Sequence, residues 1–319
     1  MHNIVSMEET MDAAYLTQSQ GMADLLVFVK VVDLGGFTAA AAALGLGKPA
    51  VTKQIQRLER SMGATLLHRT TRRMTVTEAG QVLYEHAASM ARLVEDASAS
   101  LSSLAGRPAG RLKMTASVTY GKHVLGPLLP AFHQRYPDVQ VDLLLVNRYV
   151  DLWEEGLDLA IRLTDEPPGQ LAGRPVHHFD FVLCASPRFL RGKKLVHPDQ
   201  LKTLPCLPFG VSQPGQPLVW RFDGPQRQTA AVPVSGPVIV NSSDVVRDLL
   251  LADMGLGLLP RFAVEDDLAS GRLRVALPQW MPQPAFGSTA WALWQPQRVM
   301  PLKLRVMVDF LVERLAPSV

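Results

Sequence analysis

A basic helix with one apolar face is the strongest constraint in this sequence. Between Leu44 and Arg73 the chain holds seven Lys or Arg residues and one acidic residue, in LGLGKPAVTKQIQRLERSMGATLLHRTTRR. Apolar residues recur there at intervals of four, three and four, the spacing of one helix face: Val51, Ile55, Leu58 and Met62. The spacing predicts that Lys53, Arg57 and Arg60 face solvent, as in a helix that lies against DNA phosphates.

The flanking segments predict the order of a winged helix-turn-helix. An apolar stripe predicts a first helix over about 23–34, which Gly35-Gly36 ends. Thr38 is predicted to cap a second helix, and Pro49 falls in the first turn of the basic helix, where proline is tolerated. A β-prone segment after Gly63 predicts a two-stranded wing. The alternative, an ordinary solvated basic helix, leaves this order without an explanation.

These motifs resemble the DNA-binding domain of LysR-type transcriptional regulators. The segments GGFTAAAAALGLGKPAVTKQIQRLE and LLHRTTRRMTVTEAG carry the resemblance. The chain departs from the usual family sequence at Gly36, where Ser is common, and at Lys48, where Gln is common. Gln pairs with adenine whereas Lys favours guanine or a phosphate, which predicts a different operator preference. The resemblance and the charge pattern together predict these DNA-binding residues: Thr38, Lys48, Pro49, Thr52, Lys53, Arg57, Arg69, Arg72 and Arg73.

The remainder of the chain also resembles this family, particularly its CrgA-like branch. Matching motifs include LPAFHQRYPDVQVDL, EEGLDLAIRL and GLGLLPRFAVEDDLASGRL. The resemblance implies an α/β effector-binding domain of the type II periplasmic-binding-protein fold, with a cleft between two subdomains. The residues themselves predict alternating strands and helices after 111, with a helix from 151–156 onward and a strand over 238–240. Such alternation is typical of a mainly parallel sheet with covered faces.

The predicted organisation has four parts: a disordered extension over 1–21, a winged helix-turn-helix domain over 22–80, a linker helix over 81–106, and an effector-binding domain over 111–319. Within the last, subdomain I takes 111–164 and 261–319, and subdomain II takes 165–260. The linker helix carries an apolar face that predicts pairing with a second chain. The alternative is that this face packs on the chain's own effector domain.

Polar residues follow three predicted strands of the effector-binding domain, in 117–119, 147–148 and 241–244. Ligands of open α/β sheets lie beyond the carboxyl ends of strands, and helix starts there favour an anion. An aromatic acid or another carboxylate is therefore the predicted effector. Helix caps and a solvated Arg148 are the alternatives, and Arg162 is predicted to be a structural hydrogen-bond donor. The predicted effector-binding residues are Ser117, Val118, Thr119, Asn147, Arg148, Phe209, Gly210, Ser242 and Ser243.

Charge and motif content exclude several other classes of protein. Net charge is only +3, and it is segregated: residues 22–77 hold eight Lys or Arg against three acidic residues. The sequence contains no G-x-S-x-G or H-E-x-x-H motif, so no catalytic residue, metal or cofactor is predicted. His177-His178 would point to opposite faces of a strand. Cys184 and Cys206 are predicted to be inert, with a redox switch as the alternative. No secretory signal or membrane span is predicted. Two cysteines in 319 residues do not suggest a disulfide framework, which predicts a location in the reducing cytoplasm.

The sequence therefore predicts a non-enzymatic, sequence-specific DNA-binding transcriptional regulator, controlled by a small molecule bound between two subdomains. The predicted partners are double-stranded DNA, the effector, further copies of the chain in a homodimer or homotetramer, and RNA polymerase, with no membrane. An alternative hypothesis is a cytosolic solute-binding protein or small-ligand enzyme that uses only the C-terminal fold.

Overall fold

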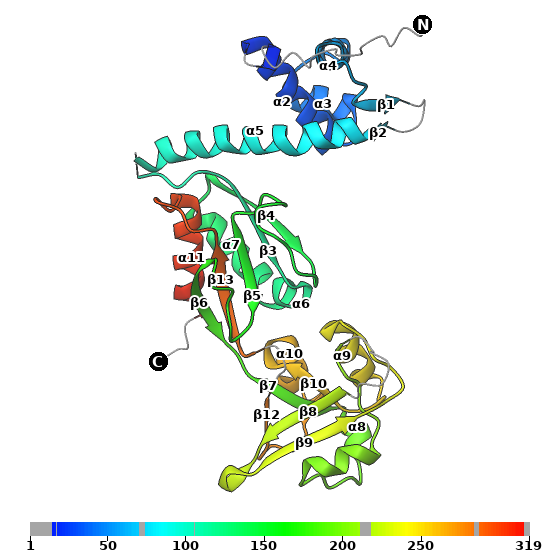
Figure 1. The fold of residues 1–319 in the computed structure, drawn as a ribbon. Coiled ribbons are helices and arrows are strands. Elements are labelled where there is room, and N and C mark those ends of the chain that lie inside the picture. The colour runs from blue at the N-terminus through cyan, green and yellow to red at the C-terminus, as the bar shows by residue number, and fades with distance from the viewer. Residues whose placement is uncertain are drawn as a thin grey trace, which may run out of the picture. The chain divides into compact units, whose positions relative to one another are not determined.

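The structure, a computed structural model, describes residues 15, 16, 18–69, 74–104, 106–210, 218–283 and 287–315, the side chains of 69, 92 and 95–104 excepted. The chain divides into two compact units, one through Ser98 and one from Ala99. Figure 1 shows their helices and strands. None of the helices in the described residues is both long and apolar enough to span a bilayer.

The N-terminal unit is a winged helix-turn-helix, as predicted. Three helices surround one apolar core, and an antiparallel pair of short strands follows them. The bounds are α2 (Ser19–Asp33), α3 (Phe37–Leu44), α4 (Lys48–Met62), β1 (Leu67–Arg69) and β2 (Met74–Val76). Gly45 and Gly63 end α3 and α4 in the left-handed conformation, which glycine adopts without strain.

Two local predictions for this unit were wrong. The first helix begins at Ser19, inside the segment predicted as a disordered extension, and the hydroxyl of Tyr15 donates a hydrogen bond to buried Asp24. The extension is therefore ordered at least at residues 15, 16 and 18–21, and 1–14 and 17 lie outside the described residues. Gly36, not Thr38, is the N-cap of α3, because Phe37 already has helical geometry.

Three residues that carry the family resemblance attach the wing to the helices. A carboxylate oxygen of Glu59 on α4 accepts hydrogen bonds from the backbone N–H groups of Leu66 and Leu67, at 2.9 and 3.2 Å. The Thr77 hydroxyl accepts the N–H of Gly80 at 2.9 Å, which caps the next helix. A Cβ on Gly80 would lie 2.2 Å from the backbone oxygen of Leu66. Only glycine allows this close approach, so the wing and the helix start are held together.

A long helix, α5 (Glu78–Leu104), follows the wing and confirms that a helix occupies the predicted linker. Leu83 and Ala87 on one side pack into the core of the N-terminal unit. Several large apolar side chains on α5 are exposed in the single chain: Val82, Met90, Leu93 and Val94. Gly106, beyond the last described residue of this helix, has the left-handed conformation that glycine adopts without strain.

A five-stranded sheet organises subdomain I of the C-terminal unit. Its strand order is β4-β3-β5-β13-β6, so β13 from near the end of the chain lies between β5 and β6 (Figure 1). β3 pairs in parallel with β4 and β5, whereas β13 is antiparallel to both of its neighbours. The strands are β3 (Gly110–Ala116), β4 (Val139–Leu145), β5 (Leu159–Leu163), β6 (Ala172–His178) and β13 (Thr289–Trp294).

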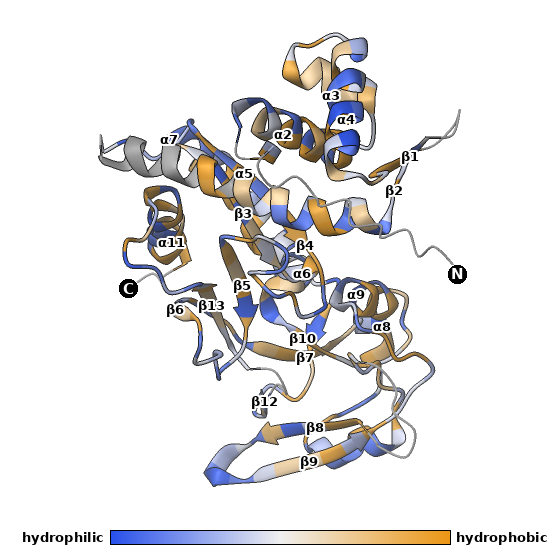
Figure 2. Cartoon of the chain, turned by 45° about the horizontal axis from the view of Figure 1, so that its top comes forward, coloured by the Kyte–Doolittle hydropathy of each residue, from blue (hydrophilic) through white to orange (hydrophobic). Residues whose placement is uncertain are grey.

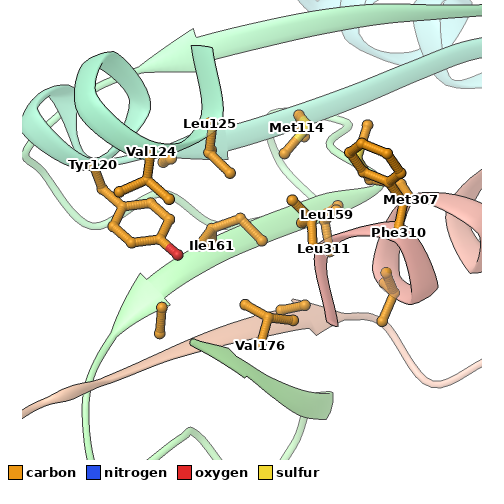
Figure 3. Close-up of a cluster of buried hydrophobic side chains, with 14 of the residues drawn as sticks. Met114, Tyr120, Val124, Leu125, Leu159, Ile161, Val176, Met307, Phe310 and Leu311 are labelled. Atoms are coloured by element: carbon orange, nitrogen blue, oxygen red, sulfur yellow. The ribbon is translucent and has the colours of Figure 1, made fainter. Parts of the chain in front are cut away.

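The helical run after β3 changes type along its length. It comprises α6 (Val118–Tyr120), a π-helical turn (Gly121–Leu125) and α7 (Gly126–Arg135). Together with the C-terminal helix α11 (Leu302–Leu315), this run packs its apolar side chains against the sheet. Figure 3 shows Tyr120, Val124 and Leu125 from the first run meeting Ile161 of β5, with Phe310 and Leu311 of α11 in the same cluster. Of the segment 261–319, which was predicted to return to subdomain I, β13 and α11 do so.

Subdomain II is built from antiparallel strands, contrary to the predicted mainly parallel arrangement. Its two sheets have the orders β10-β7-β11 and β12-β8-β9, and β7 is hydrophobic throughout (Figure 2). The elements are β7 (Phe181–Ala185), α8 (Pro187–Leu190), β8 (Leu218–Asp223), β9 (Thr229–Val234), α9 (Ser243–Leu251), β10 (Gly257–Pro260), α10 (Glu265–Ala269), β11 (Arg274–Val275) and β12 (Met281–Gln283).

Three further expectations for this unit differ from the structure. Residues 151–156 form turns rather than a helix, and the Asp151 side chain accepts hydrogen bonds from the backbone N–H groups of Trp153 and Glu154. The expected strand over 238–240 is reduced to a single parallel bridge between Phe209 and Val240. The subdomain borders also move: β6 belongs to the first sheet, while β11 and β12 belong to subdomain II, because backbone pairing rather than sequence position assigns them.

We predict that Gly80→Ala destabilises the N-terminal unit by about 1–3 kcal/mol, because the added methyl group would displace the Leu66 carbonyl. Hydrogen exchange of the α4, wing and α5 amides in the full-length protein measures the effect. Gly169→Ala is the matched control, since nothing lies within 4 Å of a Cβ at that position. Equal hydrogen-exchange protection of these amides in the two variants would show that stability does not depend on the close approach of Gly80 to the Leu66 carbonyl.

Candidate functional site

The first turns of α4 present exposed basic side chains on a rigid helix. Val51, Ile55, Leu58 and Met62 are buried in the core of the N-terminal unit, which confirms the predicted apolar face. Lys48, Pro49 and Lys53 are exposed, and Thr52 is half-buried beside them. Neither lysine has an ion-pair partner within the part of the chain that the structure describes. Both positive charges can therefore meet an external polyanion.

Arg57 does not lie on the solvent side as predicted. Its guanidinium donates two hydrogen bonds to the carboxylate of Asp24, a residue of α2 that is fully buried. These hydrogen bonds raise the pKa of Arg57, although burial opposes the shift. The ion pair joins α2 to α4, and the hydroxyl of Tyr15 completes it by donating to the same carboxylate. The helical pattern predicted that Arg57 faces solvent, but in the folded unit its charge pairs with Asp24 on another helix.

The other predicted DNA-binding residues are only partly visible. Thr38 is exposed in the first turn of α3. Arg69 ends β1, and its side chain lies outside the described part of the structure, as do Arg72 and Arg73 altogether. The antiparallel register of Leu67 with Val76 and of Arg69 with Met74 shows that the predicted wing exists on both sides of this gap.

A cavity of about 260 Å³ lies between the two subdomains of the C-terminal unit. Six of the nine predicted effector-binding residues line it: Ser117, Thr119, Asn147, Arg148, Phe209 and Ser243. The other three do not. Val118 donates its N–H to Asn147, Gly210 donates its N–H to Val240, and the Ser242 hydroxyl caps α9 by accepting the N–H of Val245. For Ser242 the structure therefore shows the helix cap that was the alternative.

Several polar groups of the cavity are committed to bonds within the protein. Asn147 accepts the N–H of Val118 at 3.0 Å and donates to the backbone oxygen of Asn241 at 3.3 Å. Arg148 lies 2.6 Å from the carboxylate of Glu155, and 62% of its side chain is exposed. These bonds shape the cavity wall, and they leave fewer groups for a ligand than the sequence indicated.

Asp244, at the start of α9, forms a charged cluster across the subdomains. Its carboxylate accepts hydrogen bonds from Lys122 at 2.6 Å and from Thr119 at 3.1 Å, and Nε2 of His123 lies 2.9 Å away. Burial raises the pKa of Asp244, but these three hydrogen bonds outweigh it, so the pKa lies below its usual value. We call these four residues the Asp244 cluster. It links α9 of subdomain II to the helical run of subdomain I.

Apart from Phe209, the apolar wall of the cavity was not predicted from the sequence, and Arg162 was predicted only as a structural hydrogen-bond donor. Arg162 lines the cavity, and it also donates to the backbone oxygens of Arg148 and Val150 at 3.4 Å each, so its predicted structural role is only part of the arrangement. The missed lining residues are Val146, Tyr149, Ile161, Leu163, Pro260 and Phe262. Tyr149 follows the Asn147-Arg148 signal directly, whereas nothing in the sequence relates Phe262 to it.

The histidines and cysteines have structural surroundings. Nδ1 of His177 lies 3.2 Å from the Tyr120 hydroxyl, and Nδ1 of His178 lies 3.1 Å from the hydroxyl of Thr289. Cys184 and Cys206 are both buried, and burial raises the pKa of each thiol to about 12. Their reactive thiolate forms are therefore rare at neutral pH, which supports the interpretation of both as inert.

Comparison with known proteins supports the same assignment for both units. Residues 22–81 match the bacterial regulatory helix-turn-helix protein family of the lysR type, and residues 105–316 match the LysR substrate binding domain. The chain is 34% identical over 291 residues to the probable HTH-type transcriptional regulator LtrA of Klebsiella pneumoniae, covering 91% of this chain and 93% of LtrA. It is 35% identical over 293 residues to the HTH-type transcriptional regulator PtxR of Pseudomonas aeruginosa, covering 91% and 92%.

A solved structure shows the same architecture over nearly the whole chain. CrgA, a LysR-type transcriptional regulator from Neisseria meningitidis, superposes with a TM-score of 0.58 at 29% identity, covering 92% of this chain and 98% of CrgA. The protein belongs to the LysR family of transcriptional regulators. It is a DNA-binding regulator with an effector-binding domain, and its family and relatives are transcriptional regulators rather than the solute-binding protein or small-ligand enzyme of the alternative hypothesis.

We predict that Asp244→Asn lowers the stability of the C-terminal unit by about 1 kcal/mol at pH 7, a value that allows for solvent screening of exposed Lys122. The pKa of Asp244 is lower in the folded protein than in the unfolded chain, where it is about 4. Its contribution to stability is therefore fully present above the unfolded pKa and is lost as pH falls through the folded pKa. Thermal unfolding from pH 7 down to about pH 2, a range that extends below the unfolded pKa, measures the difference.

Asp142→Asn is the control for this experiment, because Asp142 pairs with Arg111 on the exposed surface. The difference in unfolding temperature between wild type and Asp244→Asn should become smaller as pH falls below the unfolded pKa. The control should unfold close to the wild-type temperature at every pH. A gap that does not change with pH would show that the carboxylate charge of Asp244 is not what stabilises the contact.

Proposed function

We propose that this regulator binds a small carboxylate, such as an aromatic acid, in the cavity between its subdomains, and that occupancy changes how the protein binds DNA. The observation that carries the proposal is the composition of the cavity wall. Ser117 and Arg162 come from subdomain I, whereas Phe209 and Ser243 come from subdomain II. A molecule that contacts both sides changes the equilibrium between their relative positions, provided that it binds one arrangement more tightly. The Asp244 cluster spans the same two subdomains and would be sensitive to that change.

At the other end of the protein, we propose that Lys48, Pro49, Thr52 and Lys53 enter the major groove. This segment is exposed, begins a helix, and carries two lysines without ion-pair partners among the described residues. Arg69, Arg72 and Arg73 of the wing would contact phosphates or the minor groove. For Arg57, the bonds to Asp24 support a role in holding α4 in place rather than a direct DNA contact.

We further propose that two chains pair through α5, in a homodimer or in a tetramer made of two such dimers. The exposed Val82, Leu93 and Val94 support this assignment, since burying them against a second copy removes apolar area from water. Paired chains would present two α4 helices to two half-sites of a DNA operator. Contact with RNA polymerase and residence in the cytoplasm are proposed as consequences of acting at promoters.

We expect Lys53→Ala to weaken binding to an operator, selected from random DNA by the wild-type protein, by about tenfold. The physical reason is the loss of one cationic contact in the groove. Fluorescence anisotropy at several salt concentrations measures the affinity and its salt dependence. Lys194→Ala, which removes an equally exposed lysine in the C-terminal unit, should bind like wild type. An unchanged affinity in the Lys53 variant would refute the groove assignment.

We also expect Ser243→Phe to abolish stabilisation by effectors, because the larger ring would fill the cavity that buried Ser243 lines. Thermal unfolding of the full-length protein with a set of metabolites measures this stabilisation. Operator binding without effector should persist, since the substitution lies in the C-terminal unit. If effectors stabilise the Phe variant as much as wild type, they bind elsewhere and the proposed site is wrong.

A further inference from the structure

The cavity between the subdomains contains one half-buried positive charge that no acidic residue among the described residues neutralises. Arg162 lies on β5 and is half-buried, and burial lowers the pKa of its guanidinium, which nevertheless stays protonated. No carboxylate pairs with it among the described residues, and no acidic residue lines the cavity. Its hydrogen bonds are two long contacts of 3.4 Å to backbone oxygens. A desolvated cation in such surroundings is unfavourable until an anion joins it.

Two hydroxyl groups are available beside this charge. Ser243 is only 5% exposed and lines the cavity, yet its hydroxyl has no hydrogen-bond partner within the described structure. Ser117 lines the cavity from the other subdomain, and its hydroxyl does not cap α6. Thr119, Asn147 and Arg148 differ from both, because each is committed to a bond within the protein. A ligand can therefore contact two hydroxyls and the Arg162 guanidinium, whose only hydrogen bonds among the described residues are the two long contacts to backbone oxygens.

The rest of the wall is apolar and includes three aromatic rings. Tyr149, Phe209 and Phe262 line the cavity, together with Ile161, Leu163 and Pro260. The guanidinium carbon of Arg162 lies 5.5 Å from the centre of the Tyr149 ring, which leaves the in-plane N–H groups as the donors for a ligand. An apolar wall around a single charge favours a ligand with one charged end and a hydrophobic body.

We infer that Arg162 is the anion-binding residue of this site, and that the effector is a monocarboxylate with an apolar or aromatic body. The inference deepens the proposed function and rests on it. A single uncompensated cation balances one carboxylate, so a dicarboxylate or a phosphate would bring excess negative charge into a largely apolar cavity. The guanidinium binds the carboxylate oxygens, and the hydroxyls of Ser117 and Ser243 donate to them from the two subdomains. Arg148 stays with Glu155 and contributes little to affinity.

The experiment uses the purified full-length protein and defined probes. Benzoate and cyclohexanecarboxylate are each compared with the corresponding uncharged amide, and phthalate represents the dianion. Thermal unfolding identifies which compounds stabilise the protein, and calorimetry measures the affinity of the best one. Both acids should raise the unfolding temperature, and the amides and phthalate should not.

Variants then separate Arg162 from its neighbour. Arg162→Gln should lose about tenfold to a hundredfold in affinity for the best acid, which corresponds to a hydrogen bond with a charged group. Arg148→Gln is the matched control and should stay within about twofold of wild type. Without ligand, Arg162→Gln should unfold at the same or a higher temperature than wild type, because it removes an unpaired buried charge. A purely structural donor would lower that temperature when replaced.

Arg162→Lys replaces Arg162→Gln in the affinity measurement if the Gln variant does not fold. It keeps the charge but loses the forked pair of donors, so an intermediate loss of affinity is expected. Equal binding of acid and amide, full affinity in both Arg162 variants, or loss of affinity in Arg148→Gln alone would each overturn the inference. So would stabilisation by phthalate only, or by none of the probes.

Failure of this inference can be told apart from failure of the proposed function. If an amide or phthalate stabilises the protein and Ser243→Phe abolishes that effect, the site between the subdomains stands and the assignment of Arg162 falls. If Ser243→Phe leaves every stabilisation intact, the proposed site itself is wrong.

Discussion

The parallel pairing of β3 with both β4 and β5 determines where the cavity of the C-terminal unit lies. Parallel strands end at the same edge of a sheet, so the residues that follow them meet in space. Ser117 directly follows β3, Asn147 is the second residue after β4, and Arg162 is the penultimate residue of β5. Subdomain II then covers this edge with Phe209 and Ser243. The cavity is thus a consequence of strand direction, and its chemistry follows from the few residues at three strand ends.

Partnering among polar groups decides which of those residues remain available. A polar side chain in a cavity is either satisfied by the protein or open to a ligand, and a buried unsatisfied group is costly. Thr119, Asn147 and Arg148 have partners that hold the subdomains or the loop in place. Among the described residues, by contrast, Arg162 has no acidic partner and the Ser243 hydroxyl has no hydrogen-bond partner. The same distinction separates Arg57, which is bonded to Asp24, from Lys53 on the DNA-binding helix.

Three residues that carry the family resemblance in the N-terminal unit have a structural role, because they make contacts within the protein. Glu59 receives the first N–H groups of the wing, Thr77 caps α5, and Gly80 permits the close approach of Leu66. None of these three needs to contact DNA. They hold the wing against α4 and the start of α5, and two elements that bind one duplex must keep a fixed relative position. A short sequence motif can thus define a DNA reader through its geometry.

Sequence periodicity was sufficient for the winged helix-turn-helix order and the long helix α5. These features depend on local apolar spacing and on glycine and proline, which act within a few residues. The same rules failed for 151–156 and 238–240, where a turn and a single bridge replace the expected helix and strand. Asp151 bonds to its own following backbone, an alternative that helical periodicity does not detect.

By itself the sequence determined the class of fold, the exposed Lys48 and Lys53, and most of the polar residues around the cavity. Only the tertiary structure decided that Arg57 faces Asp24, that Phe262 joins the cavity, and that Arg162 lacks an acidic partner. Each of these depends on residues far apart in the chain, such as Asp24 and Arg57 on different helices. Local spacing fixes which way a side chain points from its own element, whereas partners and burial arise only when elements pack together.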